Sequence, residues 1–444
     1  MVEKLLADAS PQKRLFISLI TRDISLADAM LDLIDNSINA ALEPMADNLR
    51  TADDYQHLLA DTKAKPKVHI NLRVNSTRIA IDDDASGISL EMAQHHVFTF
   101  GRETEEQDSH DRLSVYGIGL KRAIFKCGNA VTISSDHRKG GFDMKLPNVR
   151  QWAAKKEDQW RFPITGREPT RSNCGTHVTI TQLHDEVLRR IDDGLFLPQL
   201  RDIIARTYSV YIGRVVEITL NNHTIEREPF EIDRNRSSQK FKQGTVTCNV
   251  QAGIAVISGE RFRERNAGWY VFCNGRAVLF ADKSTLTGWG AGLPLFHAGK
   301  YRPFLGTVFF VSPNAESLPW TTTKSDINEE SAVWQEAKRH MVTVGRTVTN
   351  FLDSRYTEEG TLIASSDLRD ASHGKMSVLD AAVANASAFR PPTTKAARET
   401  KIQYWAKISD VKKIETHLGS KMGGSAIGRH TFNFYLKNEV GDGD

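Results

Sequence analysis

Cysteine is scarce in this chain of 444 residues, which has only four. They lie far apart, and none belongs to a CxxC pair: Cys127, Cys174, Cys248 and Cys273. This spacing indicates neither a disulfide framework nor a zinc site. We therefore expect a protein of a reducing compartment, and a cytoplasmic location fits best.

Long hydrophobic runs are also missing. No apolar run approaches the roughly 20 residues that a membrane-spanning helix needs. Charged side chains interrupt the few apolar residues of the N-terminal stretch, which is atypical of a secretory signal. We expect a soluble protein with no membrane partner. The formal net charge of +3 does not by itself indicate a nucleic-acid-binding protein.

Basic residues are absent from residues 24–47, where the most informative pattern of the chain lies. Apolar residues at three- and four-residue steps predict a helix over 25–42. Ser25 occupies the expected N-cap position, Asp28 can complete a capping box, and Pro44 marks the end. Polar residues recur at the same steps on another face: Asp28, Asp32, Asn36 and Asn39.

This polar stripe has two interpretations. It can simply face water, as most polar stripes on amphipathic helices do. Solvated faces, however, normally mix positive and negative side chains, and this stripe has no cation. Carboxylate and amide oxygens suit Mg²⁺, which prefers hard oxygen ligands. The second interpretation requires a phosphate-binding segment elsewhere in the chain.

Two alternating segments, 68–74 and 78–84, predict a β-hairpin, and further strands are expected over 129–136, 141–146 and 175–183. Asp83 ends the second strand and Gly87 follows it. This pair forms either an ordinary turn or a carboxylate placed to accept a hydrogen bond from the amino group of adenine.

Residues 102–114 are polar and lack apolar periodicity, so we expect a mobile lid-like loop. The loop leads into Gly117-Ile118-Gly119-Leu120-Lys121, after which helical spacing begins. Glycines that open a helix let backbone N–H groups approach an anion. On its own this motif is a weak signal for phosphate. Thr176 places a hydroxyl at the start of the strand 175–183.

Together these motifs resemble the GHKL ATPases, a superfamily that includes DNA gyrase B subunits, ninety-kilodalton heat-shock chaperones, sensor histidine kinases and MutL proteins. The resemblance spans about residues 15–185 and rests on four boxes in the right order. They are Asp32-x-x-x-Asn36, Asp83-x-x-x-Gly87, the glycine segment 117–121 and Gly175-Thr176. The resemblance implies a Bergerat-type domain, with helices on a mixed sheet, that binds ATP and Mg²⁺.

The resemblance also implies roles for individual residues. Asn36 would bind Mg²⁺ and Asp83 adenine. The remaining ATP contacts would come from Gly87, Gly101, Gly117, Ile118, Gly119, Leu120, Lys121 and Thr176. Asp32 stands where hydrolytic members carry a glutamate, and Ala85 replaces the first glycine of the DxGxG box. The shorter carboxylate predicts slow hydrolysis, with Asp32 as the catalytic base.

From about residue 190 the pattern changes. A helical segment at 196–213 precedes strands at 215–222 and 245–256, which a polar stretch separates. A hairpin signal at Asn274-Gly275 is similar to the transducer hairpin of MutL-type proteins. After a strand at 307–313, the loop 320–328 resembles the transducer loop of gyrase-type proteins. This resemblance implies that Lys324 reaches the terminal phosphate of ATP.

We therefore predict an α/β protein with an ATP-binding domain over 1–188, a transducer-like domain over 189–356 and a polar linker with a helical segment over 357–444. Within this segment, the basic helix at 407–421 either faces water or contacts nucleic acid or a partner. The resemblance to MORC-like and MutL-like proteins implies an ATP-dependent homodimer that acts on DNA or with a partner nuclease or helicase.

Two alternatives remain for the function. One is a nucleotide-sensing scaffold without turnover, which Asp32 in place of a glutamate favours. The other is a histidine kinase. A kinase would need a phosphoacceptor helix before the ATP domain, whereas only about 24 residues precede the helix of Asn36.

Overall fold

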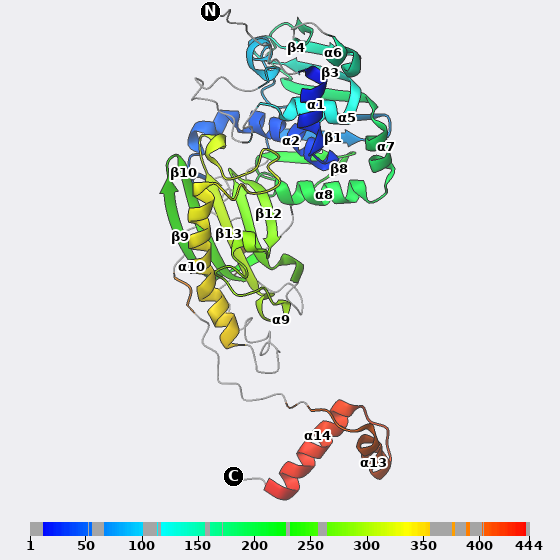
Figure 1. Cartoon of the computed structure of the whole chain (residues 1–444), viewed down its shortest axis with the longest axis vertical. Helices are drawn as coiled ribbons and strands as arrows, with labels where there is room; N and C mark the ends of the chain where they lie inside the picture. The colour runs from blue at the N-terminus through cyan, green and yellow to red at the C-terminus, as the bar shows by residue number, and fades with distance from the viewer. Residues whose placement is uncertain are drawn as a thin grey trace, which may run out of the picture. The chain divides into compact units, whose positions relative to one another are not determined.

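A computed structural model describes residues 12–51, 53–55, 66–100, 113, 117–155, 160–170, 172–227, 231–255, 264–355, 375–377, 388–390, 402 and 404–440. The chain forms two compact units, residues 1–392 and 393–444, which we describe separately. The fold is mixed α/β, as the sequence predicts (Figure 1).

The first sheet of the larger unit has eight strands in the order β5-β4-β3-β6-β2-β1-β7-β8. Neighbouring strands are antiparallel except β1 and β7, which pair in parallel. The strands are β1 Val68–Val74, β2 Arg78–Asp83, β3 Gly128–Asp136, β4 Phe142–Leu146, β5 Ile164–Gly166, β6 Gly175–Leu183, β7 Val216–Leu220 and β8 His223–Thr224. The strands predicted up to residue 183 are confirmed.

Nine helical elements accompany these strands among the described residues. They are α1 Lys13–Arg22, α2 Leu26–Leu42, η1 Glu43–Asn48, α4 Leu90–Met92, η2 Ala93–Val97, α5 Gly119–Cys127, α6 Val149–Ala154, α7 Asp185–Asp192 and α8 Phe196–Thr207. Helix α2 contacts α5, α8 and the strands β1 and β2. It is therefore covered on more than one side.

The start of α2 confirms the predicted capping box. The Ser25 side chain accepts a hydrogen bond from the Asp28 backbone N–H at 3.0 Å, and the Asp28 carboxylate accepts one from the Ser25 N–H at 3.1 Å. The helix ends at Leu42, two residues before Pro44. Its polar stripe does not simply face water, because Asp32 is only 2% exposed and Asn39 is also buried.

The second sheet has six strands in the order β12-β11-β13-β10-β9-β14. Its strands are β9 Glu231–Gln243, β10 Val246–Ala255, β11 Gly268–Cys273, β12 Arg276–Asp282, β13 Phe304–Val311 and β14 Lys375–Ser377. The long helix α10, Ala332–Ser354, packs along β9, β10 and β13 (Figure 1). Short helical turns complete this part: η3 Glu264–Asn266, η4 Thr285–Thr287, α9 Ala298–Tyr301 and η5 Ala315–Ser317.

The turn between β11 and β12 is the predicted hairpin turn. Asn274 and Gly275 have φ angles of +47° and +83°. Left-handed backbone at both central residues is typical of a type I′ turn, which suits the twist of a hairpin. In contrast, the sequence pattern predicts only a polar stretch where the structure has β9. Its charged and hydroxyl side chains hide a strand of 13 residues that lies between β10 and β14.

The first sheet extends beyond the domain boundary that the sequence suggested. Strand β7, in the segment assigned to the second domain, pairs with β1 in parallel. The predicted boundary at 188/189 therefore does not coincide with the edge of this sheet. Local pattern did not reveal this, because parallel pairing joins segments that are far apart in the chain.

The smaller unit contains α13 Ile408–Leu418, α14 Gly424–Tyr435 and η6 Leu436–Val440. Helix α13 confirms the helix expected within 407–421. Among the residues that the structure describes, no helix has both the length and the apolar character needed to span a membrane.

Candidate functional site

Asp83 ends β2 beside the first residues of β6, and its register partner is Thr176. Its Oδ2 accepts a hydrogen bond from the Ser37 hydroxyl at 2.7 Å, and its Oδ1 accepts one from the Ala85 N–H at 3.2 Å. Burial raises the pKa of Asp83 despite these hydrogen bonds. The result is a half-buried carboxylate fixed between α2 and the sheet.

Two glycines allow the chain to close tightly around Asp83. A Cβ on Gly87 would lie 2.0 Å from the Asp136 carbonyl oxygen, and the φ of Gly87 is +71°. A Cβ on Gly175 would lie 2.1 Å from the Asp83 carbonyl oxygen. Only glycine fits at either position. These contacts hold the turn after β2 against the end of β3 and the start of β6.

Asn36 lies one helical turn after Asp32 on α2. Its Nδ2 atom is buried and has no hydrogen-bond partner among the residues that the structure describes. A buried amide N–H without an acceptor costs free energy, and an oxygen atom of a bound ligand is one way to satisfy it. Within the described residues no group of three His, Cys, Asp or Glu side chains is arranged to hold a metal ion. An ion held by one amide oxygen and by phosphate oxygens needs no such group.

The glycine segment approaches α2 where α5 begins. Gly117 has a φ of +61°, and α5 starts at Gly119 without a side-chain cap. A Cβ on Gly119 would lie 3.3 Å from Oδ1 of Asp32. The backbone N–H groups at this helix start can receive an anion. Gly101 and nearly all of the expected loop 102–114 lie outside the described residues.

Lys121 is 1% exposed and donates to two backbone carbonyls. Its Nζ lies 2.7 Å from the Val97 oxygen and 2.6 Å from the Thr99 oxygen. Its ammonium therefore has protein acceptors in this structure. The side chains of Leu120 and Thr176 are half-buried, and the Thr176 hydroxyl lies 3.1 Å from that of Ser135.

Asp32 is paired with an arginine that the sequence analysis did not single out. Both Nε and Nη2 of Arg122 contact Oδ2 of Asp32, at 2.8 and 2.6 Å. Lys324 Nζ lies 3.8 Å from the other oxygen, Oδ1. Burial raises the pKa of Asp32 despite the two nearby cations.

Lys324 itself is 6% exposed and contacts Asp35 more closely. Its Nζ donates to Oδ2 of Asp35 at 2.6 Å, while Arg276 Nε and the Tyr208 hydroxyl donate to Oδ1 at 3.1 and 2.6 Å. Burial alone would raise the pKa of Asp35, but the charges of Arg276 and Lys324 and the hydrogen bonds hold it below its ordinary value.

These contacts form what we call the ion cluster: Asp32, Asp35, Arg122, Arg276 and Lys324. Every member is buried. Three cations face two carboxylates, so the cluster carries one uncompensated positive charge when both acids are ionised. An excess positive charge in a buried place favours an anion nearby. The start of α5, the segment expected to bind phosphate, adjoins the cluster.

Comparison with protein families agrees with this geometry. Residues 24–176 match the family described as "Histidine kinase-, DNA gyrase B-, and HSP90-like ATPase". This segment is a GHKL-type ATPase domain. The match begins immediately before α2 and ends at Thr176, so it includes every candidate residue except Lys324. It confirms the resemblance inferred from the sequence. No curated protein matches the chain significantly.

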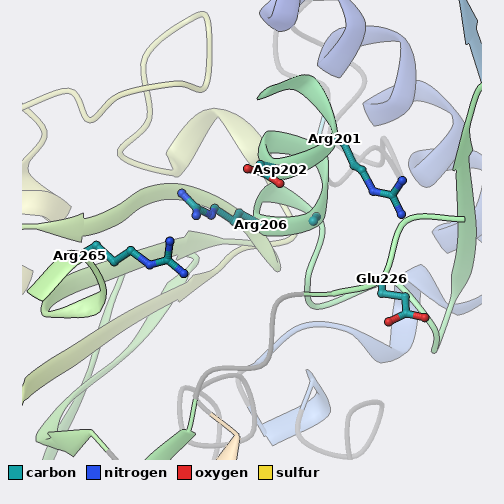
Figure 2. Close-up of a pocket in the computed structure, with 6 residues that line it drawn as sticks. Arg201, Asp202, Arg206, Glu226 and Arg265 are labelled. Atoms are coloured by element: carbon teal, nitrogen blue, oxygen red, sulfur yellow. The ribbon is translucent and has the colours of Figure 1, made fainter. Parts of the chain in front are cut away.

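A hollow of about 330 Å³ lies apart from the GHKL motifs, and none of the candidate residues lines it. Its wall includes Arg201, Asp202, Arg206, Glu226 and Arg265. Figure 2 shows the guanidinium groups of Arg206 and Arg265 pointing toward one another from α8 and η3. Acidic side chains stand among these arginines, so the hollow has less positive charge than its arginines alone suggest.

Proposed function

We propose that the chain is a Mg²⁺- and ATP-dependent conformational switch that hydrolyses ATP slowly. The observation that carries the proposal is the position of Lys324, which contacts Asp35 and Asp32 on the helix that also bears Asn36. We call the part of the chain that contains β9–β13 and α10 the second sheet domain. A loop of this domain therefore reaches the candidate nucleotide site directly.

The binding roles follow from the chemistry of each side chain. The Asp83 carboxylate would accept a hydrogen bond from the adenine amino group, with Thr176 beside it. The segment 117–121 would present backbone N–H groups to the phosphates. Gly87 and Gly101 would supply further ATP contacts, as the resemblance implies. Asn36 would hold Mg²⁺ through its amide oxygen. When bound, the ion would neutralise phosphate charge.

Asp32 is the proposed catalytic base. Its Oδ1 faces the start of α5, the element proposed to hold the phosphates. A carboxylate in this place can orient a water molecule and accept its proton. We expect slow turnover, because Asp32 has one methylene less than the glutamate typical of hydrolytic relatives and is engaged by Arg122.

Lys324 is the proposed sensor of the terminal phosphate. In this structure its ammonium is held by Asp35. Its backbone φ is +55°, and its carbonyl accepts a hydrogen bond from Arg276. A non-glycine residue in the left-handed region costs about 1–2 kcal/mol, so its surroundings must hold the loop in this shape. Exchange of Asp35 for a phosphate oxygen as the acceptor would then couple ATP to this loop.

We further propose, from the resemblance to MORC-like and MutL-like proteins, that ATP drives homodimerisation and that the protein acts on DNA or with a partner nuclease or helicase. The basic residues around α13 support contact with nucleic acid: Lys407, Lys412, Lys413 and Lys421. Such binding should weaken steeply with salt, because it releases counterions.

A nucleotide-sensing scaffold without turnover is the second candidate, favoured by the engagement of Asp32 with Arg122. Phosphate release at high enzyme concentration separates the two functions. We expect slow release by the parent and release at least about a hundredfold slower by Asp32→Asn, because general-base catalysis supplies about 10²–10⁴-fold, with ATP binding retained by both. Binding without release by the parent would support the scaffold, and no binding at all would overturn both. Sedimentation with a non-hydrolysable ATP analogue tests dimerisation.

A further inference from the structure

Arg122 of α5 contacts two other parts of the molecule with one side chain. It belongs to α5, three residues after Gly119, and is 3% exposed. Its Nε and Nη2 both contact Oδ2 of Asp32, and its Nη1 donates to the Thr322 carbonyl at 3.3 Å. Thr322 belongs to the loop that carries Lys324. The helix that starts at the glycine segment is thus tied both to the candidate base and to the second sheet domain.

The two bonds from Arg122 leave the oxygens of Asp32 unequal. Oδ2 receives both guanidinium contacts, whereas Oδ1 lies 3.8 Å from Lys324 Nζ, beyond normal hydrogen-bond length. Oδ1 also lies 3.3 Å from the point where Gly119 would carry a Cβ, so it faces the start of α5. One oxygen is fixed, and the other keeps acceptor capacity toward the proposed phosphate position.

We propose that Arg122 is a positioning residue for ATP hydrolysis, which holds the Asp32 carboxylate so that Oδ1 accepts the hydrogen bond of the attacking water. This inference rests on the proposed function. Through Thr322 the same guanidinium ties the orientation of the base to the position of the Lys324 loop. Hydrolysis then depends on the second sheet domain being docked.

The geometry of a guanidinium explains why an arginine occupies this position. A short aspartate side chain has little reach, so the direction of its free oxygen decides whether it meets the water. A planar guanidinium presents several N–H groups in a fixed fork, while a lysine ammonium is a single point charge on a flexible stem. Charge compensation alone would need only a cation. Holding the Asp32 carboxylate in one orientation needs the fixed N–H groups of a guanidinium.

Arg122→Lys in the full chain separates these two roles, because it retains the positive charge and loses the fork. We expect kcat for ATP hydrolysis to fall about tenfold or more, since general-base catalysis supplies about 10²–10⁴-fold. KM and the calorimetric affinity for a non-hydrolysable analogue should change less than about threefold. Turnover is expressed per analogue-binding site, so an unfolded fraction does not lower kcat. Arg189→Lys, an exposed arginine of α7, is the matched control.

A second measurement asks whether Arg122 acts through Asp32. In an Asp32→Asn background, single-turnover hydrolysis with excess enzyme should show no further fall when Arg122→Lys is added, because coupled residues are not additive. An Arg122→Lys protein with the parent's kcat, or an equal fall in both backgrounds, would overturn the positioning role. A parent that binds no ATP would instead overturn the proposed function itself.

Discussion

The ammonium nitrogen of Lys324 lies 2.6 Å from Oδ2 of Asp35, although 289 positions separate the two residues. Asp35 directly precedes Asn36, the proposed Mg²⁺ ligand. The loop of the second sheet domain therefore meets helix α2 at the residue beside the proposed Mg²⁺ ligand. Under the proposed function, a change at the terminal phosphate would reach that loop through this contact and through the hydrogen bond from Arg122 to the Thr322 carbonyl.

Lys324→Ala should weaken ATP about tenfold more than ADP and slow hydrolysis, because its charge would stabilise the terminal phosphate in a water-poor site. The structure adds a cost in stability. Removal of one partner of a buried ion pair costs up to about 3–5 kcal/mol, and Arg276 offsets part of it. Calorimetry with ATP and with ADP measures the ratio of the two affinities. The control variant is Lys242→Ala, which removes an exposed lysine. An unchanged ATP-to-ADP ratio would contradict the sensor role.

Asn36→Ala should abolish the Mg²⁺-dependent part of ATP binding, since it removes an oxygen ligand and leaves phosphate charge less compensated. Titration of ATP in the presence of Mg²⁺ and then of EDTA gives the metal-dependent part for parent and variant. If Mg²⁺ strengthens binding equally in both proteins, Asn36 does not hold the ion.

Asp83→Asn should weaken ATP and reduce the preference for adenine over guanine, because an amide has less acceptor capacity than a carboxylate. Asp82→Asn is a close control. Asp82 precedes Asp83 on β2, but its carboxylate contacts Arg73 and His177 instead of Ser37. Competition between ATP and GTP for a fluorescent analogue measures the preference. Equal effects of the two substitutions would count against the adenine contact.

Gly87→Ala should lower the free energy of unfolding by several kcal/mol, because it adds both left-handed strain and a Cβ 2.0 Å from the Asp136 oxygen. Gly213→Ala isolates the strain. Gly213 has a φ of +77°, yet a Cβ there would meet nothing within 4 Å. We expect a cost of about 1–2 kcal/mol at Gly213. Urea unfolding compares the two variants. Similar losses of unfolding free energy would show that the backbone near Gly87 shifts to relieve the contact with the Asp136 oxygen.

Asp35 should contribute to the pH dependence of stability. Its folded pKa lies below the ordinary value, so its contribution is present above the unfolded pKa and is lost as the pH falls through the folded one. Asp35→Asn should therefore be less stable than the parent at neutral pH, and the difference should shrink below about pH 4. Urea unfolding of both proteins, from neutral pH to below about pH 4, measures this difference in stability. A difference that stays constant with pH would assign the loss to packing.

Much of the fold around α2 could be predicted from local pattern. The capping box of Ser25 and Asp28, the first strands and the Asn274-Gly275 turn all depend on residues close in sequence, and all are confirmed. Strand β9 was missed because its polar side chains carry no clear strand signal.

The ion cluster could not be predicted, because its contacts join residues far apart in the chain. Arg122 lies 90 positions from Asp32, and Arg276 lies 241 positions from Asp35. No periodicity spans such distances. The Asn274-Gly275 turn predicted the shape of its hairpin, but it carried no sign that the following arginine meets α2. The motifs likewise gave no sign that Asp35 meets Lys324.

Strand β7 pairs in parallel with β1 and so covers one edge of that strand. It does so although it lies after residues 24–176, the segment that matches the GHKL family. In the sheet order, β1 stands between β2 and β7, so both of its edges are bonded. A fragment that ends at the predicted boundary after residue 188 would lack β7, so the edge of β1 that faces β7 would expose unpaired N–H and C=O groups. Such edges recruit strands from other chains and promote aggregation. We therefore expect such a fragment to aggregate more readily than one that retains β7, which begins 40 positions after the matched segment ends.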